Sequence, residues 1–196
     1  MYRKGKNPEF YTELAKKQNY PARSVYKLKE IDEKYRIFKH GDKVLDFGSA
    51  PGSWLLYISE KIGNNGVVTG IDIENVNIPK KNNITFFKKS IFDLQESDLK
   101  DKKFDAVVSD MAPNTTGLAF VDAGKSLELV EESFKLAKRF LKPGGNFVCK
   151  IFDSSSTSKF FNIMEKHFKF SKRFRPKAIV KQSKELYIIG CGFIEQ

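Results

Sequence analysis

The sequence predicts an α/β protein, in which a mainly parallel β-sheet has helices on both of its faces. Three observations support this: short apolar runs that suit buried strands, segments of helical period between them, and a glycine-rich turn directly after the first run. In this class of protein, ligands bind beyond the carboxyl ends of the strands. The 196 residues, 40% of them hydrophobic, suit one domain with a sizeable core.

The strands are expected where apolar residues run together, because a strand covered on both faces reads as a continuous hydrophobic stretch. The expected strands are residues 43–47, 67–71, 84–87, 104–109, 146–152 and 185–193. Apolar residues at helical spacing between them predict helices over residues 21–34, 53–62, 122–141 and 157–168. Gly63-Asn64-Asn65-Gly66 ends the second helix, and Pro143-Gly144-Gly145 ends the third.

Composition excludes several classes of protein. No run approaches the roughly 18 apolar residues of a membrane helix, and the N-terminus has no apolar stretch typical of a secretory signal. Two cysteines, Cys149 and Cys191, cannot form a disulfide framework. With only His40 and His167 beside them, we expect no metal site. A reducing intracellular compartment fits best, with cytoplasm, nucleolus and mitochondrion left open.

The positive charge lies mainly at the two ends of the chain. The formal net charge is +11; residues 1–29 hold eight Lys and Arg against two acids, and residues 135–184 hold fourteen against two. The segment between them has more acids than bases. If the two ends meet in the fold, they form one positive surface suited to a polyanion such as RNA. The alternative is an ordinary solvated surface rich in lysine.

A ligand site is expected where the first strand ends. The turn Asp46-Phe47-Gly48-Ser49-Ala50-Pro51-Gly52 lets backbone approach a ligand closely, and a helix N-terminus follows it. It matches neither common phosphate-binding glycine motif and contains a proline, so a phosphate cradle is not preferred. Asp72 closes the second strand, where an acid can accept hydrogen bonds from ribose hydroxyls. A plain turn and an acidic cap are the alternative interpretation.

Four charged residues lie at unusual positions. Lys27 lies among apolar positions of the first helix, and Asp110 ends the fourth strand. Lys150 lies inside the apolar run FVCKIF, and Glu185 opens the last strand. A buried lysine is costly unless it is paired, and a lysine near carboxylates can act on a hydroxyl proton. A surface lysine on an edge strand is the alternative for Lys150.

These segments together resemble the FtsJ-type S-adenosylmethionine-dependent ribose 2′-O-methyltransferases, from about Tyr20 to Phe193. The matching segments are ARSVYKL, LDFGSAPGSW, SDMAPNTTG, LKPGGNFVCKIF and SKELYIIG, in the order of the family. The resemblance implies a Rossmann-like class I methyltransferase with a mainly parallel seven-stranded sheet. It implies one domain over residues 1–196, with a basic N-terminal extension over roughly residues 1–20.

The resemblance also implies which residues form the site. The catalytic tetrad of the family corresponds to Lys27, Asp110, Lys150 and Glu185. S-adenosylmethionine is the implied cofactor, and its expected contacts are Gly48, Ser49, Ala50, Pro51, Gly52, Trp54, Asp72, Ser90 and Asp110. Ser90 takes the place of an acid that contacts the adenine in bacterial members, and Asp93 lies three residues later.

In the implied reaction, the methyl group passes to a ribose 2′-hydroxyl without a metal. Lys150 acts as base if neutral, or orients the hydroxyl if charged. Asp110 holds Lys150 and faces the methyl group, while Lys27 and Glu185 position the ribose. Alignment of the two reactants supplies much of the rate.

RNA is the expected partner, bound by a monomer without membrane contact. The expected RNA contacts are Arg23, Lys172, Arg173, Arg175, Lys177 and Lys181. Because the family acts on ribosomal RNA or on the tRNA anticodon loop, and this chain is compact, large-subunit ribosomal RNA is preferred. The alternatives are an anticodon-loop methyltransferase, an inactive RNA-binding module, a small-molecule methyltransferase and, least favoured, an NAD-dependent oxidoreductase.

Overall fold

A computed structural model of the protein describes residues 8–180 and 182–195. The helices are α1 (Pro8–Lys17), α2 (Val25–Tyr35), α3 (Ser53–Ile62), α4 (Ala119–Phe140) and α5 (Ser155–Met164), with short 3₁₀ turns η1 (Ile91–Asp93), η2 (Glu96–Asp98) and η3 (Glu165–His167). The strands are β1 (Lys43–Phe47), β2 (Val67–Asp72), β3 (Ile84–Lys88), β4 (Phe104–Ser109), β5 (Leu141–Phe152), β6 (Phe168–Phe174) and β7 (Glu185–Phe193).

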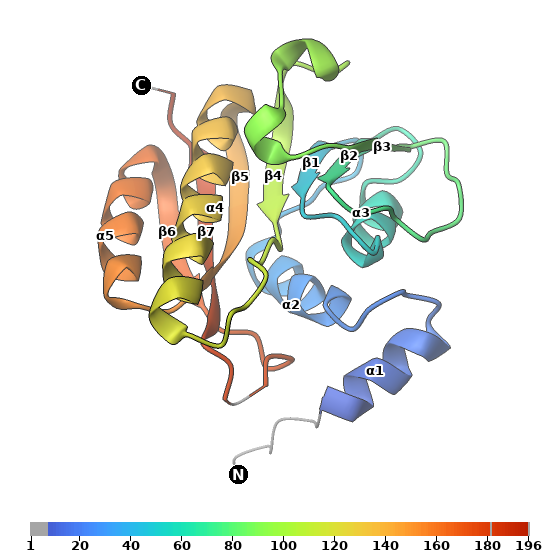
Figure 1. Cartoon of the computed structure of the whole chain (residues 1–196). Helices are drawn as coiled ribbons and strands as arrows, with labels where there is room; N and C mark the ends of the chain where they lie inside the picture. Colours follow the sequence, from blue (N-terminus) through green and yellow to red (C-terminus); the bar gives the residue numbers. More distant parts are fainter. Residues whose placement is uncertain (1–7, 181, 196) are drawn as a thin grey trace.

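All seven strands form one sheet in the order β3-β2-β1-β4-β5-β7-β6 (Figure 1). The pairs from β3 to β5 are parallel, whereas β7 runs antiparallel to both β5 and β6. The predicted α/β class and the mainly parallel, seven-stranded sheet are therefore confirmed. Because β1, β2 and β4 are parallel neighbours, their carboxyl ends meet at one edge of the sheet, where a ligand is expected.

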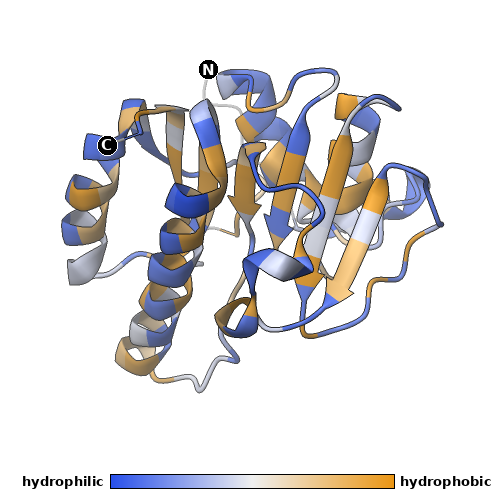
Figure 2. Ribbon diagram, turned by 90° about the horizontal axis from the view of Figure 1, so that it is seen from above, coloured by the Kyte–Doolittle hydropathy of each residue, from blue (hydrophilic) through white to orange (hydrophobic). Residues whose placement is uncertain are grey.

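Two hydrophobic cores cover the two faces of the sheet. Apolar residues of α4 and α5 pack on one face, and those of α2 and α3 pack on the other. Figure 2 shows mainly hydrophobic strands beside helices that also carry hydrophilic residues, as expected of amphipathic helices with one face in water. Among the described residues, the helices include none that is long and apolar enough to cross a membrane.

Several predicted element boundaries are corrected by the structure. The first predicted helix starts at Val25 rather than residue 21, and the third starts at Ala119. The predicted strand over 146–152 begins already at Leu141, and irregular pairing with β4 accommodates its Pro-Gly-Gly segment. Helix α1 was not predicted; of its residues only Ala15 is buried.

Strand β6 is the largest difference from the residue-by-residue prediction. The expected helix over 157–168 ends at Met164, and Phe168 begins β6. Phe168 stacks on Phe147 at 6.3 Å and contacts Phe193 at 5.6 Å between ring centroids. This packing against β5 and β7 makes the segment a strand, because tertiary contacts override weak local preference.

Candidate active site

The four singled-out charged residues lie on the face of the sheet that α2 and α3 cover. Successive side chains of a strand point to opposite faces. In β5, Val148 packs on the α2 and α3 side, so Lys150, two residues later, points the same way. Ile189 and Tyr187 of β7 also pack on that side, and Glu185 continues their alternation. Alternation of side chains thus directs both charges toward helix α2.

The structure brings the predicted tetrad together as two ion pairs. Lys27 Nζ of α2 donates to Glu185 Oε2 at 2.6 Å. Lys150 Nζ lies 3.1 Å from Asp110 Oδ1, and it also donates to the Asp110 backbone carbonyl. The Lys150 and Asp110 side chains are only 7% and 14% exposed. Lys150 is therefore a buried, paired lysine rather than a surface lysine on an edge strand.

The charges around Asp110 keep it ionised. Burial alone would raise the pKa of this carboxyl, but the positive charges of Lys150 and Lys27 and a hydrogen bond from Tyr187 outweigh it. The pKa of Asp110 therefore lies below its usual value. A carboxylate held in this state can anchor a cationic side chain next to a reacting group.

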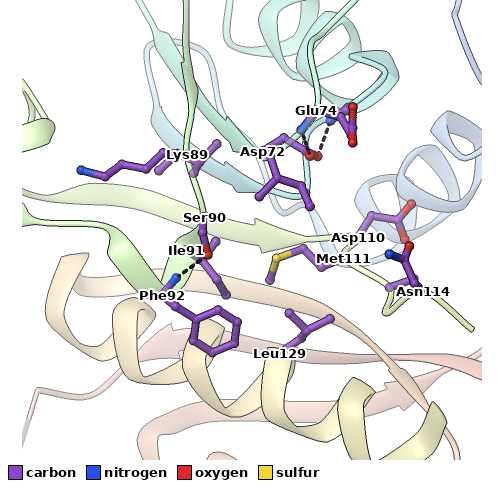
Figure 3. A pocket seen from close by; sticks show the side chains of 15 residues that line it. Asp72, Glu74, Lys89, Ser90, Ile91, Phe92, Asp110, Met111, Asn114 and Leu129 are labelled. Atoms are coloured by element: carbon purple, nitrogen blue, oxygen red, sulfur yellow. Dashed lines mark hydrogen bonds between the residues drawn. The ribbon is translucent and has the colours of Figure 1, made fainter.

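A cavity of about 380 Å³ opens beside Asp110, at the carboxyl ends of β1, β2 and β4 (Figure 3). It is lined by Gly48, Ala50, Ile71, Asp72, Ile73, Glu74, Lys89, Ser90, Ile91, Phe92, Asp110, Met111, Ala112, Asn114 and Leu129. The site predicted from the glycine turn and Asp72 is thus hollow. The residues that sequence reasoning missed here include Met111 and Asn114, which follow Asp110 within the segment SDMAPN.

The glycine turn allows the backbone to come close to this cavity. Gly48 has φ +74°, and a Cβ added there would lie 2.4 Å from Met111 Cγ and 2.9 Å from the Met111 backbone nitrogen. Gly52 has φ +112°. Both positions therefore need glycine, for backbone conformation and, at Gly48, for space.

Asp72 organises the same turn. Its Oδ2 accepts a hydrogen bond from the Ala50 backbone N–H at 2.8 Å, and its Oδ1 accepts one from Glu74 at 2.8 Å. Each carboxylate oxygen retains a free lone pair, which suits a further donor such as a ribose hydroxyl. Of the two candidates for the adenine contact, Ser90 lines the cavity, where its hydroxyl accepts a hydrogen bond from the Phe92 backbone N–H (Figure 3).

Two buried polar side chains of the glycine turn have no hydrogen-bond partner among the described residues. Both carboxylate oxygens of Asp46 and the hydroxyl of Ser49 lack a hydrogen-bond partner among the described residues, although both side chains are buried. Burial, followed by the negative charges of Asp110 and Asp72, raises the pKa of Asp46 well above its usual value. A ligand carrying positive charge would relieve this cluster of carboxyls.

Some predicted cofactor residues lie outside the cavity lining. Pro51 is exposed at the tip of the turn, and the Pro51 backbone carbonyl accepts a hydrogen bond from Asn77. Trp54 is buried in α3, where its ring stacks on Tyr187 at 6.1 Å and its Nε1 donates to the Ser24 carbonyl. Tyr187 was not among the predicted site residues, although it lies two residues after Glu185 in β7 and its side chain therefore points to the same face of the sheet.

The residues predicted to contact RNA do not all lie on the same face of the protein. The basic C-terminal segment does meet helix α2, in which the basic N-terminal segment ends, because the Lys177 backbone N–H donates to Glu30 of α2 at 2.7 Å. Lys172 and Lys177 are exposed and Arg23 is half-buried. Arg173 instead stacks on Phe161 of α5 at 4.7 Å, on the opposite face from the tetrad. Arg175 donates to the carbonyls of Val180 and Ser183, and Lys181 lies outside the described residues.

Comparison with known proteins places these features in context. The FtsJ-like methyltransferase family matches residues 20–193. Proteins named ribosomal RNA large subunit methyltransferase E are similar over nearly their whole length. The one from Desulfatibacillum aliphaticivorans is 45% identical over 192 residues, covering 96% of this chain and 93% of that protein. The one from Bdellovibrio bacteriovorus is 42% identical, covering 95% and 97%.

Solved structures agree. A chain described as a ribosomal RNA methyltransferase from Plasmodium falciparum superposes with a TM-score of 0.79 at 27% identity, covering 90% of this chain and 100% of that one. Fibrillarin from Aeropyrum pernix, solved with S-adenosyl-L-methionine bound, superposes with a TM-score of 0.56 at 18% identity. It covers 78% of this chain and 67% of that one, and at this identity the likeness concerns the fold alone.

Proposed function

Because the chain belongs to the FtsJ-like methyltransferase family, we propose that it transfers a methyl group from S-adenosylmethionine to a ribose 2′-hydroxyl of large-subunit ribosomal RNA. The observation that supports this most directly is the buried Lys150–Asp110 pair at the rim of the cavity. Such a pair suits an alcohol nucleophile, which reacts only when its proton is accepted or its oxygen is oriented.

The residues around the cavity fit the cofactor chemically. S-adenosylmethionine supplies a methyl group on a positively charged sulfur, and its methionine end carries an ammonium group. The carboxyls of Asp72 and Asp110 line the cavity. The buried carboxyl of Asp46 interacts electrostatically with both, and it has no hydrogen-bond partner among the described residues. We propose that Asp72 accepts hydrogen bonds from the cofactor ribose, that Ser90 faces the adenine, and that Asp110 faces the methionine end.

Lys150 is the proposed contact to the reacting hydroxyl. Among the described residues, its amine contacts the Asp110 carbonyl and Asp110 Oδ1, and these two contacts leave a third donor direction for the substrate. A charged amine orients the ribose oxygen from this position, and a neutral amine accepts the hydroxyl proton at Nζ. Asp110 fixes the amine in either case, so the lysine does not need to reorganise during the reaction.

The second ion pair is proposed to position the substrate ribose. Lys27 and Glu185 are somewhat more exposed than the first pair, with side chains 13% and 23% exposed. They join α2 to the start of β7, where the two basic ends of the chain meet. This placement suits contact with an RNA strand that enters from the basic side. All four residues of the tetrad belong to one chain, which supports a monomer as the active form. Because the proposed substrate is ribosomal RNA, we propose that the protein acts inside the cell.

Lys172 and Lys177 are proposed to contact RNA phosphates, because both are exposed and belong to the basic C-terminal segment. A lysine that neutralises one phosphate should lower the slope of log affinity against log salt by about one when it is replaced. We expect Lys172→Ala to reduce this slope, measured by RNA binding at several salt concentrations. Arg173→Ala is the matched comparison, because Arg173 stacks on α5; an equal reduction in both variants would contradict the proposed binding face.

The proposed activity is tested by methyl transfer from labelled S-adenosylmethionine to unmethylated large ribosomal subunits and, separately, to unmodified tRNA. Resistance to alkaline cleavage locates the modified ribose. Label on the subunits is the expected result. Label on tRNA alone would replace ribosomal RNA by the anticodon loop as the substrate. Cofactor binding with no label on either RNA would contradict the proposed reaction.

A further inference from the structure

One buried side chain beside the tetrad is not used by the proposed mechanism. Tyr187 is completely buried in β7, two residues after Glu185 and directly opposite Lys150 in the register of β5 and β7. Its hydroxyl donates to Asp110 Oδ1 at 2.6 Å. A hydrogen bond to a charged carboxylate is stronger than one between neutral groups. Tyr187 is therefore a fifth residue that is hydrogen-bonded directly to the tetrad.

Tyr187 and Lys150 hold the same oxygen of Asp110. Oδ1 accepts the Tyr187 hydroxyl at 2.6 Å and lies 3.1 Å from Lys150 Nζ. With both donors on Oδ1, the other oxygen remains available, and Asp110 lines the cavity. Loss of the tyrosine hydroxyl would leave Lys150 as the one described side chain that contacts Oδ1, so the carboxylate could turn more easily about its soft χ2 torsion.

The ring of Tyr187 connects the tetrad to the cofactor turn. It stacks on Trp54 with 6.1 Å between centroids and 30° between planes. Trp54 belongs to the first turn of α3, directly after the glycine turn, and its Nε1 donates to the Ser24 carbonyl at 3.1 Å. Ser24 precedes α2, the helix that carries Lys27. One aromatic pair thus joins β7, α3 and α2 around Asp110.

We propose that Tyr187 is a positioning residue for the methyl transfer: its hydroxyl fixes Asp110 in the orientation that holds Lys150, and its ring ties that orientation to the cofactor turn. This inference rests on the proposed function. It assigns Tyr187 no contact with either reactant. Its role is to keep the reacting amine aligned, which matters because misalignment lowers the rate of the chemical step more than it lowers binding.

The chain contains a matched control for this proposal. The Tyr57 hydroxyl donates to Asp32 Oδ2 at 2.6 Å, so it forms the same kind of buried bond in α3, on the same face of the sheet. Asp32 also accepts from the Phe38 backbone N–H and pairs with Lys61. Replacing Tyr57 by phenylalanine removes a bond of equal length away from the tetrad and the cavity.

The first experiment compares Tyr187→Phe with Tyr57→Phe in the full-length protein. Phenylalanine keeps the ring and removes only the hydroxyl. We expect Tyr187→Phe to lower kcat by about ten- to a hundredfold, the value of a hydrogen bond to a charged group, with the KM values for cofactor and RNA within about twofold. Tyr57→Phe should leave kcat unchanged, whatever it does to the melting temperature.

The second readout follows Asp110 itself. The charged groups that act on its carboxyl are Lys150 of β5, Lys27 of α2 and Asp46 of β1, and the neutral Tyr187 hydroxyl of β7 donates to it; Glu185 acts on Tyr187. Among these, the Tyr187 hydrogen bond lowers the pKa of Asp110, so its removal should raise that pKa. A carbon-13 titration of the Asp110 carboxyl should therefore move to higher pH in Tyr187→Phe, and the acidic limb of the kcat profile should move with it.

Each outcome decides the proposal. Unchanged kcat and an unmoved Asp110 titration in Tyr187→Phe would overturn it, as would equal losses of kcat in both tyrosine variants. If the wild-type protein methylates neither RNA, the proposed function fails, while the carbon-13 titration still decides whether Tyr187 holds Asp110. Should Tyr187→Phe not fold, the wild-type hydroxyl proton of Tyr187 offers the same decision: it should appear at low field in proton NMR and be lost in Asp110→Asn.

Discussion

The two halves of the sheet edge differ in whether their buried polar side chains have partners within the protein. In the half formed by β4, β5 and β7, Asp110 is bonded to Lys150 and Tyr187, and Glu185 is bonded to Lys27. In the half formed by β1 and the glycine turn, Asp46 and Ser49 are buried without a partner among the described residues. The first half thus pairs its buried charges within the protein, whereas the second half leaves two buried polar side chains without a hydrogen-bond partner among the described residues.

This difference has a physical basis. A buried charge that is paired within the fold needs no rearrangement when the substrate arrives, which favours fast chemistry. A buried polar group left without a partner costs stability, and a ligand that satisfies it regains that free energy on binding. The comparison predicts that substitutions in the first half affect turnover and that substitutions in the second half affect cofactor affinity and the pH dependence of folding.

The largest effect is expected for Lys150→Ala. Without the amine, the ribose hydroxyl is neither oriented nor deprotonated, so kcat should fall by about 10² to 10⁴-fold, measured as transfer of labelled methyl groups. Cofactor affinity, measured by calorimetry, should change little. Near-normal turnover with normally bound cofactor would contradict the role given to Lys150.

Lys142→Ala is the control for that experiment. Lys142 belongs to the same strand and pairs with Asp105 at 2.7 Å, far along β5 from Lys150. The Lys142→Ala substitution removes a lysine–aspartate ion pair from the same sheet and leaves the four residues of the tetrad unchanged. We expect its kcat to equal that of the wild type, so a comparable loss in both variants would indicate a general effect on the sheet.

A smaller effect, on binding rather than turnover, is expected for Gly48→Ala. The added Cβ would collide with Met111, and alanine at φ +74° is strained. A left-handed non-glycine residue costs about 1–2 kcal/mol of folding stability. The collision displaces Met111 at the cavity wall, so cofactor affinity should fall about tenfold, or about 1.4 kcal/mol, in calorimetry. Gly144→Ala has a similar φ of +82° and no atom within 4 Å, so it separates strain from collision. Equal cofactor affinity in both variants would contradict the close approach at Gly48.

The smallest effect on turnover and binding is expected from variants that change the pH dependence of stability, and the sign of that dependence differs between the two halves. The pKa of Asp46 is raised in the folded state, so its contribution to stability is full below the unfolded pKa and is lost as pH rises. Asp46→Asn should therefore become more stable relative to wild type as pH rises from about 4, by at most about 1.4 kcal/mol per pH unit. Chemical denaturation at pH 5 and pH 8 measures this.

Asp110 should behave in the opposite way. Its pKa is lowered in the folded state, so it contributes stability above the unfolded pKa and loses it as pH falls through the folded pKa. Asp110→Asn should therefore be less stable than wild type at pH 8, and the difference should shrink toward acidic pH. The same pH trend in both asparagine variants would show that the two halves do not differ as described.

Much of the fold could be predicted from local sequence pattern. The strands from β1 to β5 and β7 are apolar runs, and helix α3 was predicted with its observed bounds. The segments that escaped residue-by-residue prediction are α1, of which only Ala15 is buried, and β6. Strand β6 exposes most of its residues and depends on the ring of Phe168 packing against β5 and β7.

The sequence by itself determined the class of the sheet, the glycine turn and the four charged residues of the tetrad. Lys150 is conspicuous because a charge inside an apolar run is costly, and Asp110 and Glu185 are conspicuous because they lie at strand ends. Only the tertiary structure decided the partners: Lys27 pairs with Glu185 across 158 positions of sequence, Arg173 faces away from the tetrad, and Trp54 turns toward Tyr187. Local periodicity fixes the face a side chain points to, whereas its partner depends on which distant strands and helices pack together.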